Sequence, residues 1–375
     1  MPDFPAAEFQ QRFKWAESAM EAASLDALLF TTEAEIRYFT GFRTLFWQSP
    51  TRPWFLILPK GGKPIAVIPT IGAELMATTW VDDIRTWPSP RPEDEGINLL
   101  RDALAGFRRI GMPMGEESSL RMGLGDLDRL RAGLDAEFID ATPAIKALRM
   151  VKSAAEIAIL TQICAIGSDA FARAGSLFTE GQPLDHAFRA FKIALLEAGA
   201  EDVPYLVGGA GPGGYGDVIS PPSDRRLQRG DVLMLDTGAT LQGYFCDFDR
   251  NFAIGAANSA AKSAYRALFA ATEAGLAAAK PGIRCSELFK VMTDELPGNG
   301  ASVGRFGHGL GMQLTEWPSI AAHDHTLLQA GMVITLEPSM QLAPGRMMVH
   351  EENILITETS AKFLTRRAAR ELPVI

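Results

Sequence analysis

Acidic residues follow or interrupt several apolar stretches in the second half of the chain, and such carboxylates can bind metal ions. Val232–Leu235 is typical of a buried strand and ends in Asp236. The next strand-like segment, Gly243–Phe252, carries Asp247 and Asp249, which strand alternation places on one side of the sheet. A carboxylate in such surroundings is costly unless it is paired or binds a cation.

The same pattern recurs twice toward the C-terminus. Val333–Leu336 is apolar and is followed by Glu337, and the apolar segment Met347–Ile356 contains Glu351 and Glu352. Four apolar, strand-like segments thus carry carboxylates that would be costly to bury, and a separate explanation for each is hard to find. A single cation cluster accounts for all of them, because divalent cations prefer oxygen ligands of this kind.

One histidine completes the set of candidate ligands. His308 lies in the segment Phe306–Gly311, where glycines on both sides let the backbone pack closely around an imidazole. Carboxylates and an imidazole suit a pair of divalent metal ions such as Mn, Co, Fe or Zn, and no cysteine has the spacing of a thiolate site.

The length of the chain predicts two domains, since domains usually have roughly 100–200 residues. We place the first over residues 1–145 and the second over 146–375 of this 375-residue chain. The first is expected to be an α/β unit, with a helix over 9–23 and strands over 26–30, 54–59 and 64–68, the last two joined by a tight turn at 60–63.

Local signals predict the helices that support the acidic strands. Ser153 and Glu156 form a capping box, which begins a helix that extends to about residue 174. Pro183 begins a second helix that ends at Gly199. A third helix is expected over 259–280, and the final third of the chain is expected to alternate strands and turns.

Composition narrows the class of protein. Hydrophobic residues make up 47% and charged residues 22% of the chain, as in globular proteins, and the net charge of −9 disfavours nucleic acid as a partner. Three cysteines without paired spacing suit a reducing compartment. The N-terminus has no signal-peptide pattern, and no stretch approaches the roughly 20 apolar residues of a membrane span. We therefore expect a cytoplasmic protein without a membrane partner.

The motifs together resemble those of the pita-bread metallopeptidases, which include methionine aminopeptidase, aminopeptidase P, prolidase and their non-peptidase relative creatinase. The resemblance covers nearly the whole chain, and the ligands follow one another in the order and approximate spacing of the family. The matching segments are Tyr38–Phe42, Arg149–Ile157, Asp236–Gly238, Gly243–Arg250, His308–Gly311, Leu336–Pro338 and Glu351–Thr357.

The resemblance implies a fold and a division of roles. The fold would be α/β: a creatinase-like N-terminal domain, then a pita-bread domain whose curved antiparallel sheet is flanked by helices in two pseudo-two-fold halves, within a homodimer. Asp236 would bind one metal ion, Asp247 and Glu351 would bridge both, and His308 and Glu337 would bind the other. A hydroxide between the ions would attack an amide, and Glu337 would accept its proton.

The chain departs from the family beside the metal ligands. The loop over 208–217 lacks a histidine that family peptidases carry there, and the segment over 312–318 lacks a second one. Asp249 stands where the family usually has threonine. These departures leave the ligands intact and change the surroundings of the substrate. The candidates for that substrate shell are Tyr215, Asp217, Asp249, Thr315 and Glu316.

Three functions are compatible with these residues. The first is metal-dependent hydrolysis of an amide in a short peptide or other small molecule, similar to an Xaa-Pro dipeptidase or aminopeptidase. The second uses the same metal site for a non-peptide reaction: a lyase acting on a dimethylsulfoniopropionate-type compound, or a C–N hydrolase of a compatible solute or a creatine-like compound. The third is a non-catalytic binding protein, which the complete ligand set argues against.

Overall fold

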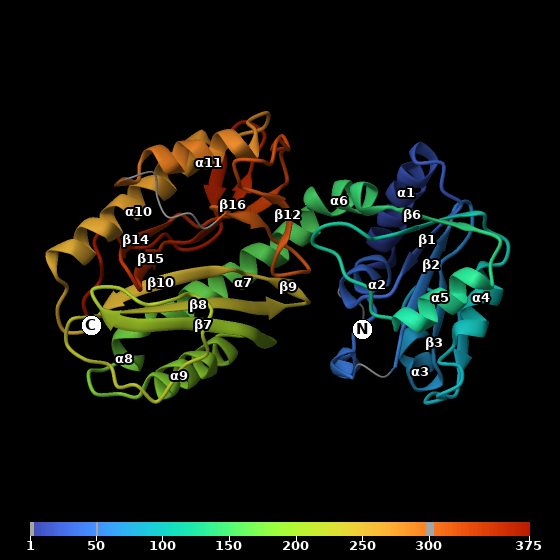
Figure 1. The fold of residues 1–375 in the computed structure, drawn as a ribbon, viewed down its shortest axis with the longest axis horizontal. Helices are drawn as coiled ribbons and strands as arrows, with labels where there is room; N and C mark the ends of the chain where they lie inside the picture. The colour runs from blue at the N-terminus through green and yellow to red at the C-terminus, as the bar shows by residue number, and fades with distance from the viewer. Residues whose placement is uncertain (1–3, 50–51, 298–303) are drawn as a thin grey trace. The chain divides into compact units, whose positions relative to one another are not determined.

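The protein consists of two compact units, Met1–Arg149 and Met150–Ile375 (Figure 1). They are described from a computed structural model that covers residues 4–49, 52–297 and 304–375. The domain boundary expected after residue 145 lies inside helix α6 (Thr142–Met150), and the two units divide near the end of that helix.

The N-terminal unit is a mixed six-stranded sheet with helices, in the strand order β4-β3-β2-β1-β5-β6. The hairpin expected from the turn at 60–63 is confirmed, because β2 and β3 pair antiparallel. The strands are β1 (Ala27–Phe30), β2 (Phe55–Pro59), β3 (Ile65–Pro69), β4 (Asp83–Trp87), β5 (Arg109–Met112) and β6 (Glu137–Asp140). The helices are α1 (Ala6–Ala22), α2 (Glu33–Thr40), α3 (Ala73–Met76), α4 (Ile97–Leu104) and α5 (Leu124–Ala132), followed by α6.

The helices of the C-terminal unit begin and end close to the positions expected from the sequence. The capping box is confirmed, with Ser153 Oγ accepting from the Glu156 N–H at 3.2 Å and the Glu156 carboxylate accepting from the Ser153 N–H at 2.9 Å. One helix in the final third, α11, was not expected. The helices are α7 (Ala154–Ala172), α8 (Ala174–Leu177), α9 (Leu184–Glu197), α10 (Ser259–Ala278) and α11 (Cys285–Asp294).

Helix α7 corrects one sequence expectation. Its 19 residues have a mean hydropathy of 1.3, so it is long and apolar enough to cross a membrane by length and composition alone. However, 56% of that window is buried inside the protein, where the helix packs against β8 and α9. A helix that is apolar on several sides is also typical of the core of a globular domain.

The strands of the C-terminal unit form antiparallel sheets between the helices. In Figure 1, α10 and α11 lie on one outer side of this unit, α8 and α9 lie on the opposite side, and β7, β8 and β10 run between them. The first sheet has the order β10-β8-β7 with β9 beside β8, the second has the order β12-β11-β13-β16-β17, and β14 pairs with β15. This arrangement agrees with the expected pita-bread architecture.

The strand bounds show where the sheets are interrupted. The first sheet contains β7 (Asp202–Pro212), β8 (Asp231–Leu241), β9 (Tyr244–Phe245) and β10 (Phe248–Ala253). The second contains β11 (His308–Gly309), β12 (Glu316–Ser319), β13 (Val333–Leu336), β16 (Glu352–Ile356) and β17 (Ala361–Phe363), and the third contains β14 (Ser339–Ala343) and β15 (Arg346–Val349).

Three of the acidic strands differ from the sequence expectation. Asp236 does not end its strand, because β8 continues to Leu241. The segment expected as one strand over 243–252 is broken into β9 and β10, and Asp247 lies in the break. The segment over 347–356 is likewise broken, with Glu351 between β15 and β16. Only Glu337 follows its strand as expected, directly after β13.

The close pairing of β11 and β12 brings His308 to the sheet, and it depends on a glycine. A Cβ atom at Gly309 would overlap the backbone carbonyl of Trp317 in β12. Since backbone cannot move aside as a flexible side chain can, the sequence requires glycine at this position.

We expect Gly309→Ala to destabilise the protein by at least about 2 kcal/mol, because the two strands must separate to admit the methyl group. Thermal unfolding followed by circular dichroism measures this. Gly175→Ala in α8 is the matched control, since its added methyl group meets no atom within 4 Å. Equal melting temperatures for the Gly309 variant and the wild type would show that the strands are not in close contact.

Candidate metal centre

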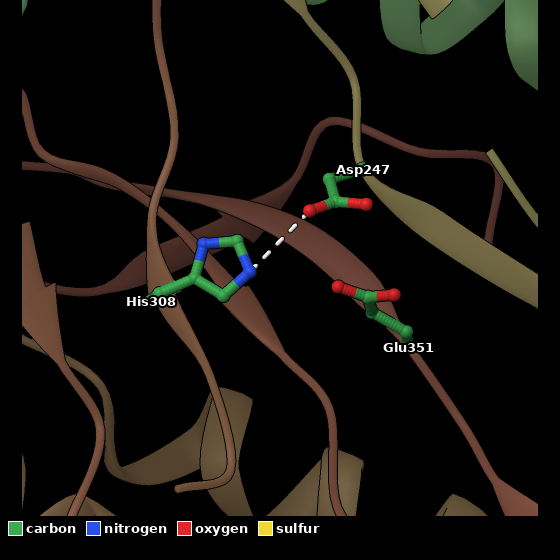
Figure 2. Close-up of side chains that lie close together, drawn as sticks. All are labelled: Asp247, His308 and Glu351. Atoms are coloured by element: carbon green, nitrogen blue, oxygen red, sulfur yellow. Dashed lines mark ion pairs between the residues drawn. The ribbon is translucent and has the colours of Figure 1, made fainter. Parts of the chain in front are cut away.

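Side chains from three separate segments converge at the sheet interruptions. Asp247, His308 and Glu351 are buried, and one ligand atom of each lies within 4.8 Å of the others. Figure 2 shows the two carboxylates and the imidazole pointing toward one another. The Nε2 atom of His308 lies 3.3 Å from Asp247 Oδ2 and 3.8 Å from Glu337 Oε2. These distances place four of the five predicted ligands around one point.

The fifth predicted ligand, Asp236, belongs to the same cluster. It lies in β8 and pairs with Asp249 of β10 across the ladder. Burial raises the pKa of the Asp236 carboxyl well above its ordinary value, and the nearby carboxylates of Asp247, Asp249 and Glu337 raise it further. Asp249 in turn accepts from the Glu351 N–H, so Asp236 lies in the same region as the other four predicted ligands.

The orientation of His308 suits a metal ligand. Its Nδ1 lies 2.9 Å from the backbone carbonyl of Gly309, and a carbonyl can only accept, so Nδ1 carries the proton. The other ring nitrogen, Nε2, faces Asp247 and Glu337, and in the neutral imidazole it carries the lone pair that would bind a cation. Histidines that bind metal ions typically donate the second ring N–H to a carbonyl or carboxylate in this way.

Two buried carboxylate oxygens have no hydrogen-bond partner among the described residues. These are Asp236 Oδ1 and Glu351 Oε1. Burial is also the main reason that the pKa of the Glu351 carboxyl is raised well above its ordinary value, followed by repulsion from Asp247 and Asp236. Buried carboxylate oxygens without partners are very costly unless a cation binds them. The donor set of oxygens and one imidazole therefore fits divalent cations.

An asparagine side chain holds the backbone of Asp247 in the break between β9 and β10. Asn353 Oδ1 accepts from the Asp247 N–H at 3.0 Å, and Asn353 Nδ2 donates to the Asp247 carbonyl. The amide of Asn353 thus replaces both ladder bonds that a neighbouring strand would supply. This frees Asp247 from the pleat while keeping its peptide fixed.

A second chain of buried polar groups holds the backbone at Glu351. Asp249 Oδ1 accepts from the Glu351 N–H, and Asp249 Oδ2 accepts from Asn251 Nδ2 at 2.6 Å. Tyr215 donates its hydroxyl to Asn251 Oδ1 at 3.1 Å and accepts from the Val349 N–H at 2.6 Å. Tyr215 and Asp249 therefore support Glu351 from behind and do not face an open site.

The other candidates for the substrate shell lie in different surroundings. Glu316 is buried and forms an ion pair of 3.0 Å with Lys152, with side chains 2% and 1% exposed. Asp217 is exposed, and its carboxylate accepts from the backbone of Ile219 and Ser220 within its own turn. Thr315 is partly buried and accepts from Arg305 Nη2 at 3.4 Å. Thr315 thus lies beside Arg305, which contacts Glu337 of the cluster.

Several residues near the cluster were not selected from the sequence. The Tyr205 hydroxyl hydrogen-bonds to the Asp236 carboxylate. Arg305 Nε lies 3.8 Å from Glu337 Oε1. Only the position of Arg305, three residues before His308, offered a signal. The partners of Lys152 and Asn353 are 164 and 106 positions away, so nothing local marks them.

Comparisons with known proteins agree with this geometry. The family model described as metallopeptidase family M24 matches residues 158–358, and the creatinase/prolidase N-terminal domain matches residues 12–151. A Xaa-Pro dipeptidase of Pyrococcus horikoshii is 28% identical over 360 residues, which cover 94% of this chain and 96% of the relative. A Xaa-Pro dipeptidase of Pyrococcus furiosus is 32% identical over 63% of this chain and 68% of the relative.

A solved structure gives the same result for the fold. The crystal structure of dipeptidase PepE from Mycobacterium ulcerans superimposes with a TM-score of 0.86 and 29% sequence identity, over 99% of each chain. Both units are therefore matched along their whole length.

The crowded carboxylates lead to a prediction for metal-free protein. The folded-state pKa of Asp236 is raised, so the folded protein holds a proton that the unfolded chain releases near pH 4. Stability from this group is therefore lost as pH rises above about 4. We expect metal-free Asp236→Asn to melt several degrees above metal-free wild type at pH 7, and this difference to shrink at pH 4.

Differential scanning calorimetry after chelation measures this difference, and saturating Mn²⁺ provides the control. With the metal ion present the order should reverse, because the wild type then gains a ligand that the asparagine variant lacks. A variant that is less stable than the wild type at pH 7 without metal would contradict the repulsion described here.

The buried polar chain behind Glu351 also gives a prediction. Asn251→Ala removes the link between Tyr215 and Asp249, so we expect metal affinity to fall about 10- to 100-fold, as for other residues that orient metal ligands. Isothermal titration with Mn²⁺ measures the affinity. The control is Asn258→Ala, which removes the N-cap of α10 and should lower stability by about 1 kcal/mol without changing metal affinity. Equal metal affinities in both variants would mean that the hydrogen-bonded groups of Tyr215, Asn251 and Asp249 do not position Glu351.

Proposed function

The chain belongs to metallopeptidase family M24, and on this premise we propose that it cleaves short Xaa-Pro peptides with two divalent cations. Metal-dependent peptidase activity follows from the family, and the match extends over both units. The preference for proline and for dipeptides is proposed from relatives named Xaa-Pro dipeptidase. The observation that supports the proposal most strongly is the cluster of buried carboxylates around His308, with two oxygens that have no partner among the described residues.

The five residues divide into groups by their position. Asp247 and Glu351 each have a ligand atom within 4.8 Å of the other and of His308, which suits the bridging role that we propose for them. Asp236 would hold one cation, and His308 with Glu337 the other. When bound, the cations lower the pKa of a water molecule and polarise the carbonyl group under attack.

Glu337 is best placed to move a proton. Its side chain is 23% exposed, whereas those of Asp247 and His308 are 6% and 4% exposed. A carboxylate that is both part of the cluster and open to solvent can accept a proton from the attacking water and pass it on to the leaving nitrogen. We therefore propose Glu337 as the general base.

The non-peptide reactions have no comparable support. A lyase or C–N hydrolase was considered because two family histidines are absent near the cluster. However, the relatives reported above are named as peptidases, and their similarity extends over most of the chain. The complete ligand cluster argues equally against a protein that only binds.

We propose further that the metal ion is manganese, that the protein acts as a homodimer, and that it resides in the cytoplasm. The oxygen-rich ligand set suits manganese. The cysteines Cys164, Cys246 and Cys285 are buried and free, which suits a reducing compartment. The dimer is proposed from the family resemblance, and sedimentation equilibrium tests it.

The proposed activity is tested with a panel of Xaa-Pro dipeptides and tripeptides and Mn²⁺-loaded protein. We expect release of free proline from dipeptides by the wild type and loss of at least about 10³-fold in kcat/KM for Asp247→Ala, because this change removes a ligand of the whole cluster. Metal content of both proteins is measured in parallel. Metal-loaded protein that cleaves none of the peptides would rule out the Xaa-Pro proposal.

A further inference from the structure

A cleft of about 850 Å³ lies in the C-terminal unit beside α10. It is lined by one face of that helix, by the residue that follows α11, and by residues between positions 367 and 371. Figure 1 shows α10 and α11 on one outer side of this unit. Small-molecule sites have volumes of roughly 300–1,000 Å³. None of the five predicted metal ligands lines the cleft, so it is separate from the metal centre.

The less exposed residues of this lining are apolar, and we call them the floor of the cleft. They are Phe269, Ala270 and Ala368, and the Phe269 side chain is buried. The Arg367 guanidinium lies over the Phe269 ring, 4.4 Å from its centroid, and pairs with Glu273. A short apolar group that packs on this floor loses contact with water, which favours binding.

Charged side chains of both signs form the more exposed part of the lining, which contains three arginines and three glutamates. Arg266 pairs with Glu371 at 2.8 Å, and both side chains are more than half exposed. Arg370 and Glu295 are exposed as well, and within residues 4–49, 52–297 and 304–375 neither side chain forms an ion pair or hydrogen bond. The cleft therefore offers one positive and one negative charge to a ligand.

This balance of charge indicates the class of ligand. The three glutamates would repel a polyanion, and the three arginines would repel a polycation. A molecule with one carboxylate and one ammonium group matches Arg370 and Glu295, and an apolar stem between these groups would pack on the floor. Amino acids and short peptides have this chemistry.

The C-terminal segment connects the cleft to the metal centre. The N–H of Ala368 donates to Glu352 Oε1 at 2.8 Å. Arg250 donates from Nη2 to Glu352 Oε2 and from Nη1 to the Glu351 carbonyl, both at 2.9 Å. Because Glu351 is a predicted metal ligand, a molecule that steadies Ala368 also steadies this ligand through a few hydrogen bonds.

Helix α10 provides a second connection. The Phe269 ring packs edge-on against the ring of His350, with 5.8 Å between the centroids. The hydroxyl of Thr272, also on α10, lies 3.1 Å from His350 Nδ1. His350 directly precedes Glu351 in the chain. Both the helix and the C-terminal segment thus lead from the cleft to the same metal ligand.

We propose that this cleft is a second binding site, for a zwitterionic amino acid or short peptide, and that its occupation tightens the binding of the metal ions. The ligand would join α10, the residue after α11 and the C-terminal segment, and so fix both connections to Glu351. By reciprocity the metal ions would raise the affinity for the ligand by the same factor. This inference concerns the regulation of the metal centre and does not depend on which peptide the enzyme cleaves.

The probe for binding is ε-aminocaproate, which is zwitterionic, has an apolar stem and contains no peptide bond. Calorimetric titration of Mn²⁺-loaded protein should show that the wild type binds it. Arg370→Gln and Glu295→Gln should each bind it at least about fivefold more weakly, because each loses a charge-assisted contact. Caproate and hexylamine, which carry one charge each, should bind more weakly than the probe.

The matched control is Arg173→Gln. Arg173 is an exposed arginine that pairs with Glu197 on α9, and neither residue lines the cleft. This variant should bind the probe as the wild type does. Leucine and trialanine then distinguish the two sources of the ligand, since the tighter binder of the two indicates a free amino acid or a short peptide.

A second titration measures the coupling between the sites. With saturating ε-aminocaproate, the affinity of metal-free wild type for Mn²⁺ should rise at least about fivefold, and that of Arg370→Gln should not change. Equal binding of the probe by the wild type, Arg370→Gln and Glu295→Gln would show that the cleft is not a site. Binding that the variants lose but that leaves the Mn²⁺ affinity of the wild type unchanged would overturn the coupling.

Discussion

Repulsion among buried carboxylates is the constraint on which the C-terminal unit depends. Asp236, Asp247, Glu337 and Glu351 surround one imidazole, and burial raises the pKa of three of these carboxyl groups. In an apolar interior such a cluster is costly unless bound cations or protons neutralise it. Asp236 Oδ1 and Glu351 Oε1 have no hydrogen-bond partner in the part of the chain that the structure describes, so the need for a cation is greatest there.

The fold meets this constraint by interrupting its strands. Asp247 and Glu351 lie in breaks, where the backbone is free of the pleat and the side chain can turn toward the cluster. Each break would leave peptide groups without partners, and side chains from elsewhere supply them. Asn353 bonds the peptide of Asp247, and Asp249 bonds the N–H of Glu351. The carboxylates can therefore depart from sheet geometry without loss of backbone hydrogen bonds.

The two sides of the cluster have different tasks. Behind Glu351, Tyr215, Asn251 and Asp249 form a closed polar chain that fixes the ligand. On the other side, Glu337, Arg305 and Thr315 are partly exposed, and Arg305 contacts both of the others. This separation explains why residues that differ from the family pattern near the ligands need not alter the metal chemistry. Asp249 helps to hold the backbone of Glu351, whereas Thr315 contacts Arg305 on the partly exposed side of the cluster.

The sequence by itself determined the elements whose signals are local. The helix that begins with Ser153 and Glu156, the hairpin at residues 60–63, and the acidic residues in apolar surroundings could all be predicted, because each signal lies within a few residues. The acidic residues in apolar strands and His308 were found in the same way, and the family resemblance selected five of them as ligands. What they had in common was the cost of burying a carboxylate or an imidazole.

Only the tertiary structure decided where the strands break and what the remaining polar residues do. Glu316 was a candidate for the substrate shell because its segment lacks a family histidine, but Lys152, 164 residues away, pairs with it in the interior. The sequence over 243–252 predicts one continuous strand. In the structure Asn353, 106 residues from Asp247, bonds the Asp247 backbone in place of a neighbouring strand, and the strand is broken there. Contacts between segments so distant in the chain arise only when the sheets assemble, so no local pattern encodes them.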